Sequence, residues 1–148
     1  MRISAKARYG LAAMISIAQK YNTGEITTVI SLSEKLKISK IYLEQVFSLL
    51  KRADLVNSTK GSQGGYQLAA APKEITAFDI LSSIEAALFE KTSETISQKN
   101  HAIEKTMQDT VFKKLDENVE NTLKSITLAE LVNETEKNSS EDGYMFYL

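Results

Sequence analysis

The segment 39–52 contains closely spaced side chains that can form hydrogen bonds with the edges of DNA bases. Gln45 can pair with adenine through two hydrogen bonds, Glu44 can accept one from the amino group of cytosine, and Ile41 can contact a thymine methyl group. Such residues would act near the N-terminus of a helix, because that end reaches the bases of the major groove. The predicted base-contacting set is Ser39, Lys40, Ile41, Tyr42, Glu44 and Gln45, and for Tyr42 the alternative is packing in the core.

Basic side chains around this segment are candidates for phosphate contacts. Such contacts neutralise phosphates and fix the register of a protein on the duplex without reading its sequence. The candidates are Arg2, Lys6, Arg8, Lys51 and Arg52. For each of them, the alternative is an ordinary solvated surface charge.

A glycine-rich turn follows, between predicted strands at 55–60 and 66–68. Its three glycines allow positive φ and a close approach of the backbone to a surface, which is typical of a hairpin that lies against DNA. A phosphate-binding nucleotide loop is the alternative, but neither Gly-Lys-Ser/Thr nor a helix follows. We therefore add to the predicted DNA-contacting set Lys60, which would enter or flank the minor groove, and Gly61, Gly64 and Gly65.

Three amphipathic helices are predicted to hold these residues in place. Apolar residues three and four positions apart indicate the first helix, over 4–21. Thr28 is the expected N-cap of the second, over 29–36, because the competing capping box at Ser31 would leave barely one turn. Ser39 would cap the third, over 40–53. Its buried stripe is Leu43, Val46, Phe47 and Leu50.

Two short helices joined by a three-residue turn and followed by a hairpin predict a winged helix-turn-helix. The fold class is therefore mostly α, with a small β-hairpin wing and a long helix for dimerisation. Charge fits this interpretation, although the 148-residue chain has a net charge of only −1. The first 66 residues carry ten basic and four acidic side chains, a balance of +6, and the remainder carries −7. Only the basic half would have to meet phosphate.

Composition excludes several classes of function. No cysteine is present, which excludes disulfides, thiol chemistry and a cysteine-ligated zinc or iron–sulfur site made by this chain alone. One histidine and no convincing pair of nucleophile and base argue against an enzyme, and we expect no metal or cofactor. No apolar run approaches the roughly 18 residues of a membrane span, and no signal peptide is evident, so we expect a cytoplasmic protein.

The acidic half is predicted to serve assembly. A capping box at Thr76 and Asp79 begins a helix over 77–88, and a polar loop spans 90–100. A helix over 101–124 then carries an apolar stripe that a small domain cannot bury alone, so pairing with a second copy is expected, and intramolecular packing is the alternative. The stripe is Ile103, Met107, Val111, Phe112, Leu115, Val119 and Leu123.

Two further features complete this half. A short helix is expected over 127–136, and the aromatic end, 143–148, should dock on this protein or on a partner. We divide the chain into a DNA-binding region, 1–75, and a dimerisation and regulatory region, 76–148.

Several motifs together resemble the Rrf2 family of bacterial transcription regulators. They are MRISAKARYG at 1–10, YLEQVF at 42–47, LKRADLV at 50–56, KGSQGGYQL at 60–68, ITAFDI at 75–80 and TLAEL at 127–131. The resemblance implies a dimeric winged helix-turn-helix whose recognition helix is 39–52. It also implies DNA contacts by Glu44 and by the basic wing residue Lys60, where lysine replaces the more usual arginine.

Several members of this family hold an iron–sulfur cluster through three cysteines in the loop before the long helix, and this chain has none. His101 lies near the region of the fourth ligand, but one histidine cannot hold a cluster, so we expect a capping or surface residue. The missing cysteines and the ending DGYMFYL at 142–148 resemble a cluster-free repressor of cysteine metabolism, which pairs with cysteine synthase. The resemblance thus implies a possible protein partner of that kind.

The sequence predicts a homodimeric, sequence-specific DNA-binding regulator, with a repressor of cysteine or sulfur metabolism as its specific form. Its two recognition helices would lie about one helical turn apart on a pseudo-palindromic duplex. The alternative is a protein-interaction module that docks a metabolic enzyme through the acidic half and the C-terminal tail.

Overall fold

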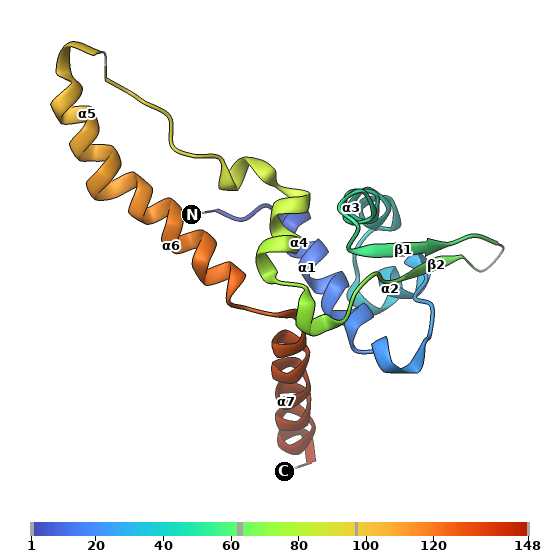
Figure 1. The fold of residues 1–148 in the computed structure, drawn as a ribbon. Coiled ribbons are helices and arrows are strands. Elements are labelled where there is room, and N and C mark those ends of the chain that lie inside the picture. The colour runs from blue at the N-terminus through green and yellow to red at the C-terminus, as the bar shows by residue number, and fades with distance from the viewer. Residues whose placement is uncertain (1, 62–63, 97, 148) are drawn as a thin grey trace.

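The structure, a computed structural model, describes residues 2–61, 64–96 and 98–147, without the side chains of residues 98 and 143–147. It is mostly helical, with one two-stranded antiparallel sheet (Figure 1). The elements are α1 (Ala5–Ala18), α2 (Val29–Leu36), α3 (Lys40–Arg52), β1 (Val56–Thr59), β2 (Gly65–Leu68), α4 (Ala77–Ile84), α5 (His101–Met107), α6 (Lys113–Lys124) and α7 (Leu128–Tyr147). The predicted fold class is confirmed.

Side-chain caps define where the first three helices begin. The hydroxyl of Ser4 accepts a hydrogen bond from the backbone N–H of Ala7, and the hydroxyl of Thr28 accepts one from Ser31, each at 3.1 Å. Ser39 caps α3 in the same way. Thr28 is therefore the N-cap of α2, as predicted. The first helix ends at Ala18, three residues earlier than predicted, and a 3-10 turn over Tyr21–Thr23 follows.

The core is assembled around α3. Its predicted stripe, Leu43, Val46, Phe47 and Leu50, is completely buried, together with residues of α1 and α2 that include Met14 and Leu32. The same core continues past residue 75, because Ile80 of α4 and Leu128 of α7 belong to it. Apolar packing therefore holds α3 rigidly and leaves its opposite side to the solvent.

The wing is a hairpin in which Val56 pairs with Leu68 and Thr59 pairs with Gly65. Thr27 adds a bridge that the sequence analysis did not predict. Its N–H donates to the carbonyl of Tyr66 at 3.0 Å, and the N–H of Tyr66 donates back at 2.8 Å. The Tyr66 ring also stacks on Phe47, with ring centroids 4.3 Å apart. The base of the wing is thus fastened to the core, while Ser62 and Gln63 of the predicted turn lie outside the described residues.

Helix α4 begins with the predicted capping box, since Thr76 and Asp79 cap each other's backbone N–H groups. It ends at Ile84, four residues earlier than predicted. Glu85 leaves the helical conformation, with φ −136° and ψ 68°, and a 3-10 turn over Ala86–Phe89 follows. The break coincides with a long-range hydrogen bond from the backbone of Ser4 to the Glu85 carboxylate.

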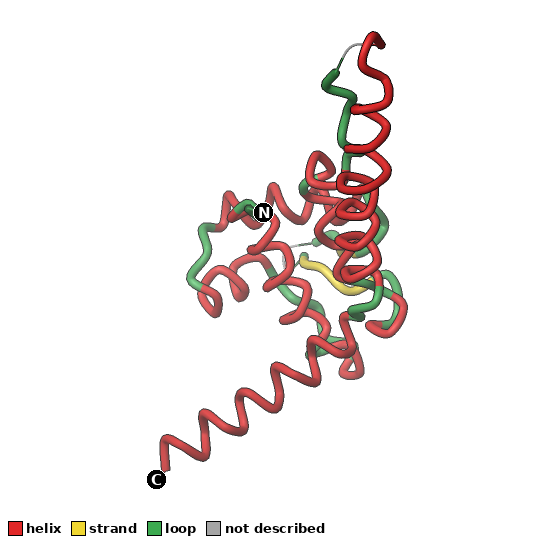
Figure 2. The backbone as a smooth tube through the Cα atoms, turned by 90° about the vertical axis from the view of Figure 1, so that its left-hand side faces the viewer, coloured by secondary structure: helices red, strands yellow, loops and turns green. Residues whose placement is uncertain are grey.

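Residues 101–124 form one long helical element, which we call the rod. It consists of α5, a π-helical segment over Gln108–Phe112, and α6. The rod inclines away from the rest of the fold (Figures 1 and 2). The chain returns to the core at residues 126–128, where the Leu128 N–H donates to the carbonyl of Ile75 at 2.8 Å.

Helix α7 is longer than predicted. It runs to Tyr147 rather than to residue 136, and it projects from the fold (Figure 2). The chain has no proline after Pro72 to stop the helix. Its first turns touch the core through Leu128, Leu131 and Val132. The side chains of the aromatic end lie outside the described residues, so its docking stays a prediction. In the part of the chain that the structure describes, no helix combines the length and apolarity needed to cross a bilayer.

Candidate nucleic-acid interface

The exposed side of α3 presents most of the residues that were predicted to contact bases. The side chain of Ile41 is 71% exposed, and Ser39, Lys40, Glu44 and Gln45 are exposed as well. The Lys40 ammonium lies 3.9 Å from the Glu44 carboxylate, one helical turn away. Lys40 therefore balances the negative charge that Glu44 would otherwise present on this face.

A surface hollow connects this face with α1. Lys6 lines it together with residues of α3, namely Ile41, Glu44, Gln45, Ser48 and Leu49. The structure therefore places one predicted phosphate-contacting lysine beside the predicted base-contacting residues. Ser48, which was absent from the predicted set, lies in the same hollow because it follows Glu44 by one turn of α3.

The other basic candidates are all exposed. Arg2 and Arg8 are exposed at the start of α1, and Lys51 and Arg52 are exposed in the last turn of α3. Two cations at that position also interact favourably with the carbonyl end of the helix. Lys51 and Arg52 therefore add positive charge at the C-terminal end of the exposed face of α3.

Tyr42 packs against α1 and is only partly exposed. Its side chain is 39% exposed, and its ring meets the ring of Tyr9 edge to face, with centroids 5.3 Å apart. Tyr42 thus links α3 to α1, as the packing alternative anticipated in part, while some of its surface stays accessible.

In the wing, Lys60 and Gly61 are exposed, and Gly61 has φ +128°, which favours glycine. Gly65, by contrast, is buried. A Cβ atom added there would lie 2.4 Å from the carbonyl oxygen of Thr27. The close approach that Gly65 makes is therefore to its own chain. Lys60 and Gly61 belong to the accessible surface of the wing, together with Asn57 and Thr59. Gly64 is half-buried.

The predicted dimerisation stripe divides into two groups. Ile103, Val111 and Leu115 are 52–56% exposed, whereas Met107, Phe112, Val119 and Leu123 are half-buried. Most residues of the stripe are four positions apart. On an ideal α-helix, each such step turns the next side chain by about 40° around the helix axis, so the stripe winds around the rod. The π-helical segment inserts extra backbone in the middle of the stripe and offsets part of this winding.

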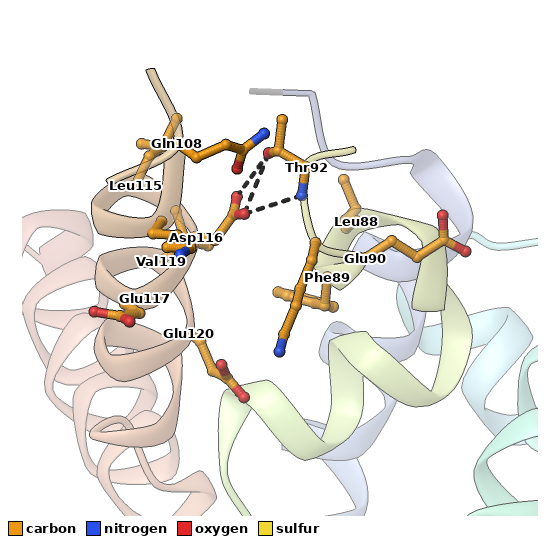
Figure 3. A pocket seen from close by; sticks show the side chains of 12 residues that line it. Leu88, Phe89, Glu90, Thr92, Gln108, Leu115, Asp116, Glu117, Val119 and Glu120 are labelled. Atoms are coloured by element: carbon orange, nitrogen blue, oxygen red, sulfur yellow. Dashed lines mark hydrogen bonds between the residues drawn. The ribbon is translucent and has the colours of Figure 1, made fainter. Parts of the chain in front are cut away.

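The loop before the rod is anchored by carboxylates of the rod. The buried carboxylate of Glu104 accepts hydrogen bonds from the N–H groups of Ile96, at 2.9 Å, and Thr95, at 3.2 Å, and from the side chain of Gln108. These bonds, led by that from Ile96, lower the pKa of Glu104. Asp116 holds the other end of the loop through the N–H and hydroxyl of Thr92 (Figure 3). A loop was predicted here, but neither anchor was.

A cavity of about 500 Å³ lies between this loop and the rod (Figure 3). Leu88, Phe89, Leu115 and Val119 provide its apolar lining, and Asp116 points across it towards Thr92. Two residues of the predicted dimerisation stripe, Leu115 and Val119, therefore face the protein's own 3-10 turn as well.

An exposed polar recognition helix, an adjoining wing and a core that rigidly supports both define a winged helix-turn-helix protein of the DNA-binding class. The model of the Rrf2 family, described as iron-dependent transcriptional regulator, matches residues 3–134. The chain therefore belongs to the Rrf2 family of transcriptional regulators.

Individual relatives agree with this assignment. CymR, an HTH-type transcriptional regulator of Bacillus subtilis (strain 168), is 34% identical over 148 residues, which cover 100% of both chains. IscR of Klebsiella pneumoniae (strain 342) is 33% identical over 139 residues, 92% of this chain and 82% of IscR. These relatives are transcriptional regulators, not enzymes.

Solved structures show the same likeness. The structure of CymR, the global cysteine regulator of B. subtilis, matches with a TM-score of 0.74 over 90% of this chain and 98% of CymR, at 34% identity. IscR of T. potens matches with a TM-score of 0.73 at 33% identity, over 99% of this chain and 97% of that one.

The iron dependence in the family's description does not fit the residues present here. The chain has no cysteine, and His101 at the start of α5 is exposed. Within the described residues, no three histidine, aspartate or glutamate side chains converge as metal ligands. Glu104, next to the loop, is already committed to Ile96, Thr95 and Gln108. We therefore derive no step of the function through iron.

Proposed function

We propose that this regulator acts as a homodimer in the cytoplasm and represses transcription by binding a pseudo-palindromic DNA site. The observation that carries this proposal is the division of α3 into a fully buried stripe and an exposed face with Lys40, Ile41, Glu44 and Gln45. A helix supported in this way can enter the major groove without loss of packing. Residues 1–75 would read the DNA, and residues 76–148 would hold the two readers at the required spacing.

The exposed part of the rod supports the homodimer. Ile103, Val111 and Leu115 would each expose more than half of their surface to water in a lone chain. A second copy related by two-fold symmetry can cover the same patch on both chains. The two recognition helices would then be held about one helical turn of DNA apart. Because the two chains are related by two-fold symmetry, the two half-sites that they read would form a palindrome.

Selection of duplexes from a random pool, followed by binding titrations over a salt series, tests this function. We expect an inverted repeat to be enriched, and we expect log affinity to fall linearly with log salt concentration, with a slope of about −0.9 for each phosphate contact. Glu44→Ala should relax the base preference at one position in each half-site, by about 1–3 kcal/mol of discrimination.

Glu130→Ala is the matched control, because it removes the same charge from an exposed position on α7. It should leave the base preference unchanged. A salt-independent affinity would contradict the phosphate contacts, and an unchanged preference in Glu44→Ala would remove Glu44 from the base-reading set.

A protein partner is the second candidate function. The likeness to CymR over the full length of both chains supports a role in cysteine metabolism, with cysteine synthase as the partner that the resemblance implies. Its docking element would be the aromatic end at 144–148. Deletion of these residues should abolish capture of cysteine synthase but leave DNA affinity within about twofold. Equal capture by the shortened and full chains, measured by calorimetry, would reject this partner site.

A further inference from the structure

The cavity between the loop and the rod has the dimensions of a small-molecule site. Its volume is about 500 Å³, and ligand pockets in proteins commonly measure about 300–1,000 Å³. Leu88, Phe89, Leu115 and Val119 give it an apolar lining, a property that such sites share. The residues that line it belong to segments 88–92 and 108–120, so a molecule bound there would leave α3 and the wing accessible.

Hydrogen bonds from the rod fix the loop that forms one wall of this cavity. Asp116 accepts from the N–H of Thr92 at 3.1 Å, and the side-chain amide of Gln108 donates to the carbonyl of Ser93 at 3.2 Å. Glu104 fixes the loop farther along through its two bonds to loop N–H groups. Because the wall is held in place without a ligand, binding does not have to order it, and this ordering would otherwise reduce the affinity.

The charges that line the cavity favour a cation. Four carboxylates and two ammonium groups belong to the lining. Lys113 pairs with Asp109 at 3.0 Å, and Glu120 pairs with Lys124 at 2.9 Å, so these two lining charges are balanced. The remaining lining charges are one ammonium group and three carboxylates, Lys91, Glu90, Asp116 and Glu117. Within the part of the chain that the structure describes, no ion pair neutralises any of these three carboxylates, and the cavity therefore carries a net negative charge.

Asp116 is the carboxylate best placed to meet a bound cation. It points across the cavity towards Thr92, and Leu88 and Phe89 lie on the wall opposite the rod (Figure 3). An ionised carboxylate has about four acceptor sites, and the two donors of Thr92 occupy about half of them. The others can accept from an ammonium group in a charge-assisted hydrogen bond. The cavity thus combines an anionic acceptor with apolar walls.

From this arrangement we propose that the cavity is a binding site for a small organic amine. The ammonium group donates to Asp116, and the apolar body lies against Leu88, Phe89 and Val119. A neutral apolar molecule leaves the negative charge unmet, and an anion is repelled by it. A side chain from a second copy of the chain is the competing occupant, and it would exclude the amine. The site is separate from the face proposed to bind DNA and does not depend on that function.

The test titrates the full-length protein with 2-phenylethylamine at neutral pH, where the amine is protonated. The backbone amide resonance of Thr92 is followed by NMR, because this N–H is bonded to Asp116. The matched probes are 2-phenylethanol, which keeps the body without the charge, phenylacetate, which reverses the charge, and methylamine, which keeps the charge without the body. The Thr92 resonance should shift and saturate with the amine, which should bind about ten- to a hundredfold more tightly than the alcohol. Phenylacetate and methylamine should not saturate the shift below about 10 mM.

Three variants locate the site. Asp116→Asn removes the charge but keeps an oxygen that can accept from Thr92, so it should bind the amine and the alcohol with affinities within about twofold of each other. Leu88→Trp fills the apolar side of the cavity and should abolish binding of both. Asp142→Asn makes the same change of charge at an exposed position of α7 and should behave as wild type. Thermal unfolding of each variant verifies that its fold is retained.

Saturation by the amine, its preference over the alcohol and the loss of this preference in Asp116→Asn would together support the site. The absence of a saturable shift with the amine below about 10 mM would overturn it and leave the cavity to a second copy of the chain. Equal binding of amine and alcohol by wild type, or an unchanged preference in Asp116→Asn, would also overturn it. If Leu88→Trp does not fold, Asp116→Asn still decides. The titrations contain no DNA, so failure of this site and failure of the proposed DNA binding are distinguished.

Discussion

Replacement of Val111 and Leu115 by aspartate is expected to separate the dimer and to weaken binding to a two-half-site duplex by about 10²–10⁴-fold. Both side chains are more than half exposed on the rod, so the change removes apolar surface that only a partner can bury. In the dimer, the symmetry would bring four new carboxylates into one interface, where each would lose its water. A monomer retains one DNA-binding region, and it therefore loses the affinity that is gained when two such regions are linked.

The measurement combines mass and affinity. Light scattering should give the mass of one 16.5 kDa chain for the variant and twice that mass for wild type. Binding to a duplex with a single half-site should be nearly equal for both. The matched control is Asn121→Asp, which places an aspartate at an exposed polar position of the same rod, about 120° around the helix from Leu115. A variant that stays dimeric, or a monomer that binds the full site as tightly as wild type, would contradict this assignment of the rod.

Phe47→Ala is expected to lower the free energy of unfolding by about 3–5 kcal/mol, a large part of the 5–15 kcal/mol that is typical of a domain. Phe47 is completely buried, and its ring stacks on Tyr66 with an angle of 10° between the planes. The change therefore leaves a cavity in the core and also removes an aromatic pair that fastens the wing. Chemical denaturation with urea measures the loss.

Ser48→Ala is the control for Phe47→Ala, because Ser48 is the next residue along α3 and is exposed. Its free energy of unfolding should change by less than about 0.5 kcal/mol. Phe47→Leu should recover much of the loss, since leucine refills most of the volume. A loss below about 1 kcal/mol in Phe47→Ala would show that the core does not depend on this ring.

The helices of the DNA-binding region were predictable because the sequence signals that define them are local. An N-cap such as Thr28 or Ser39 satisfies N–H groups two or three residues away, so it needs no tertiary partner. The same is true of the capping box at Thr76 and Asp79. The buried stripe of α3 was predictable for a related reason, since the periodicity of a helix alone brings Leu43, Val46 and Leu50 to one side.

Lengths of elements were less predictable where a distant contact intervenes. Helix α4 ends early at Glu85, whose carboxylate turns to Ser4, and the wing gains a bridge from Thr27. The polar loop before the rod looked unanchored in sequence, yet Glu104 and Asp116 hold it. In α7 the local signals were too weak to place the end, because nothing after residue 136 forbids a helix and little favours one.

The class of this protein could be predicted from sequence alone, because the caps, the apolar periods, the split of charge and the family motifs all depend on residues close together in the chain. The absence of cysteine likewise excludes a cysteine-held cluster. The packing of the helices brings distant residues together: Lys6 and Glu44 line one hollow because α1 packs on α3, and Glu85 accepts a hydrogen bond from Ser4 because α4 packs on α1. Such contacts join residues that are dozens of positions apart, and no local pattern in the chain encodes them.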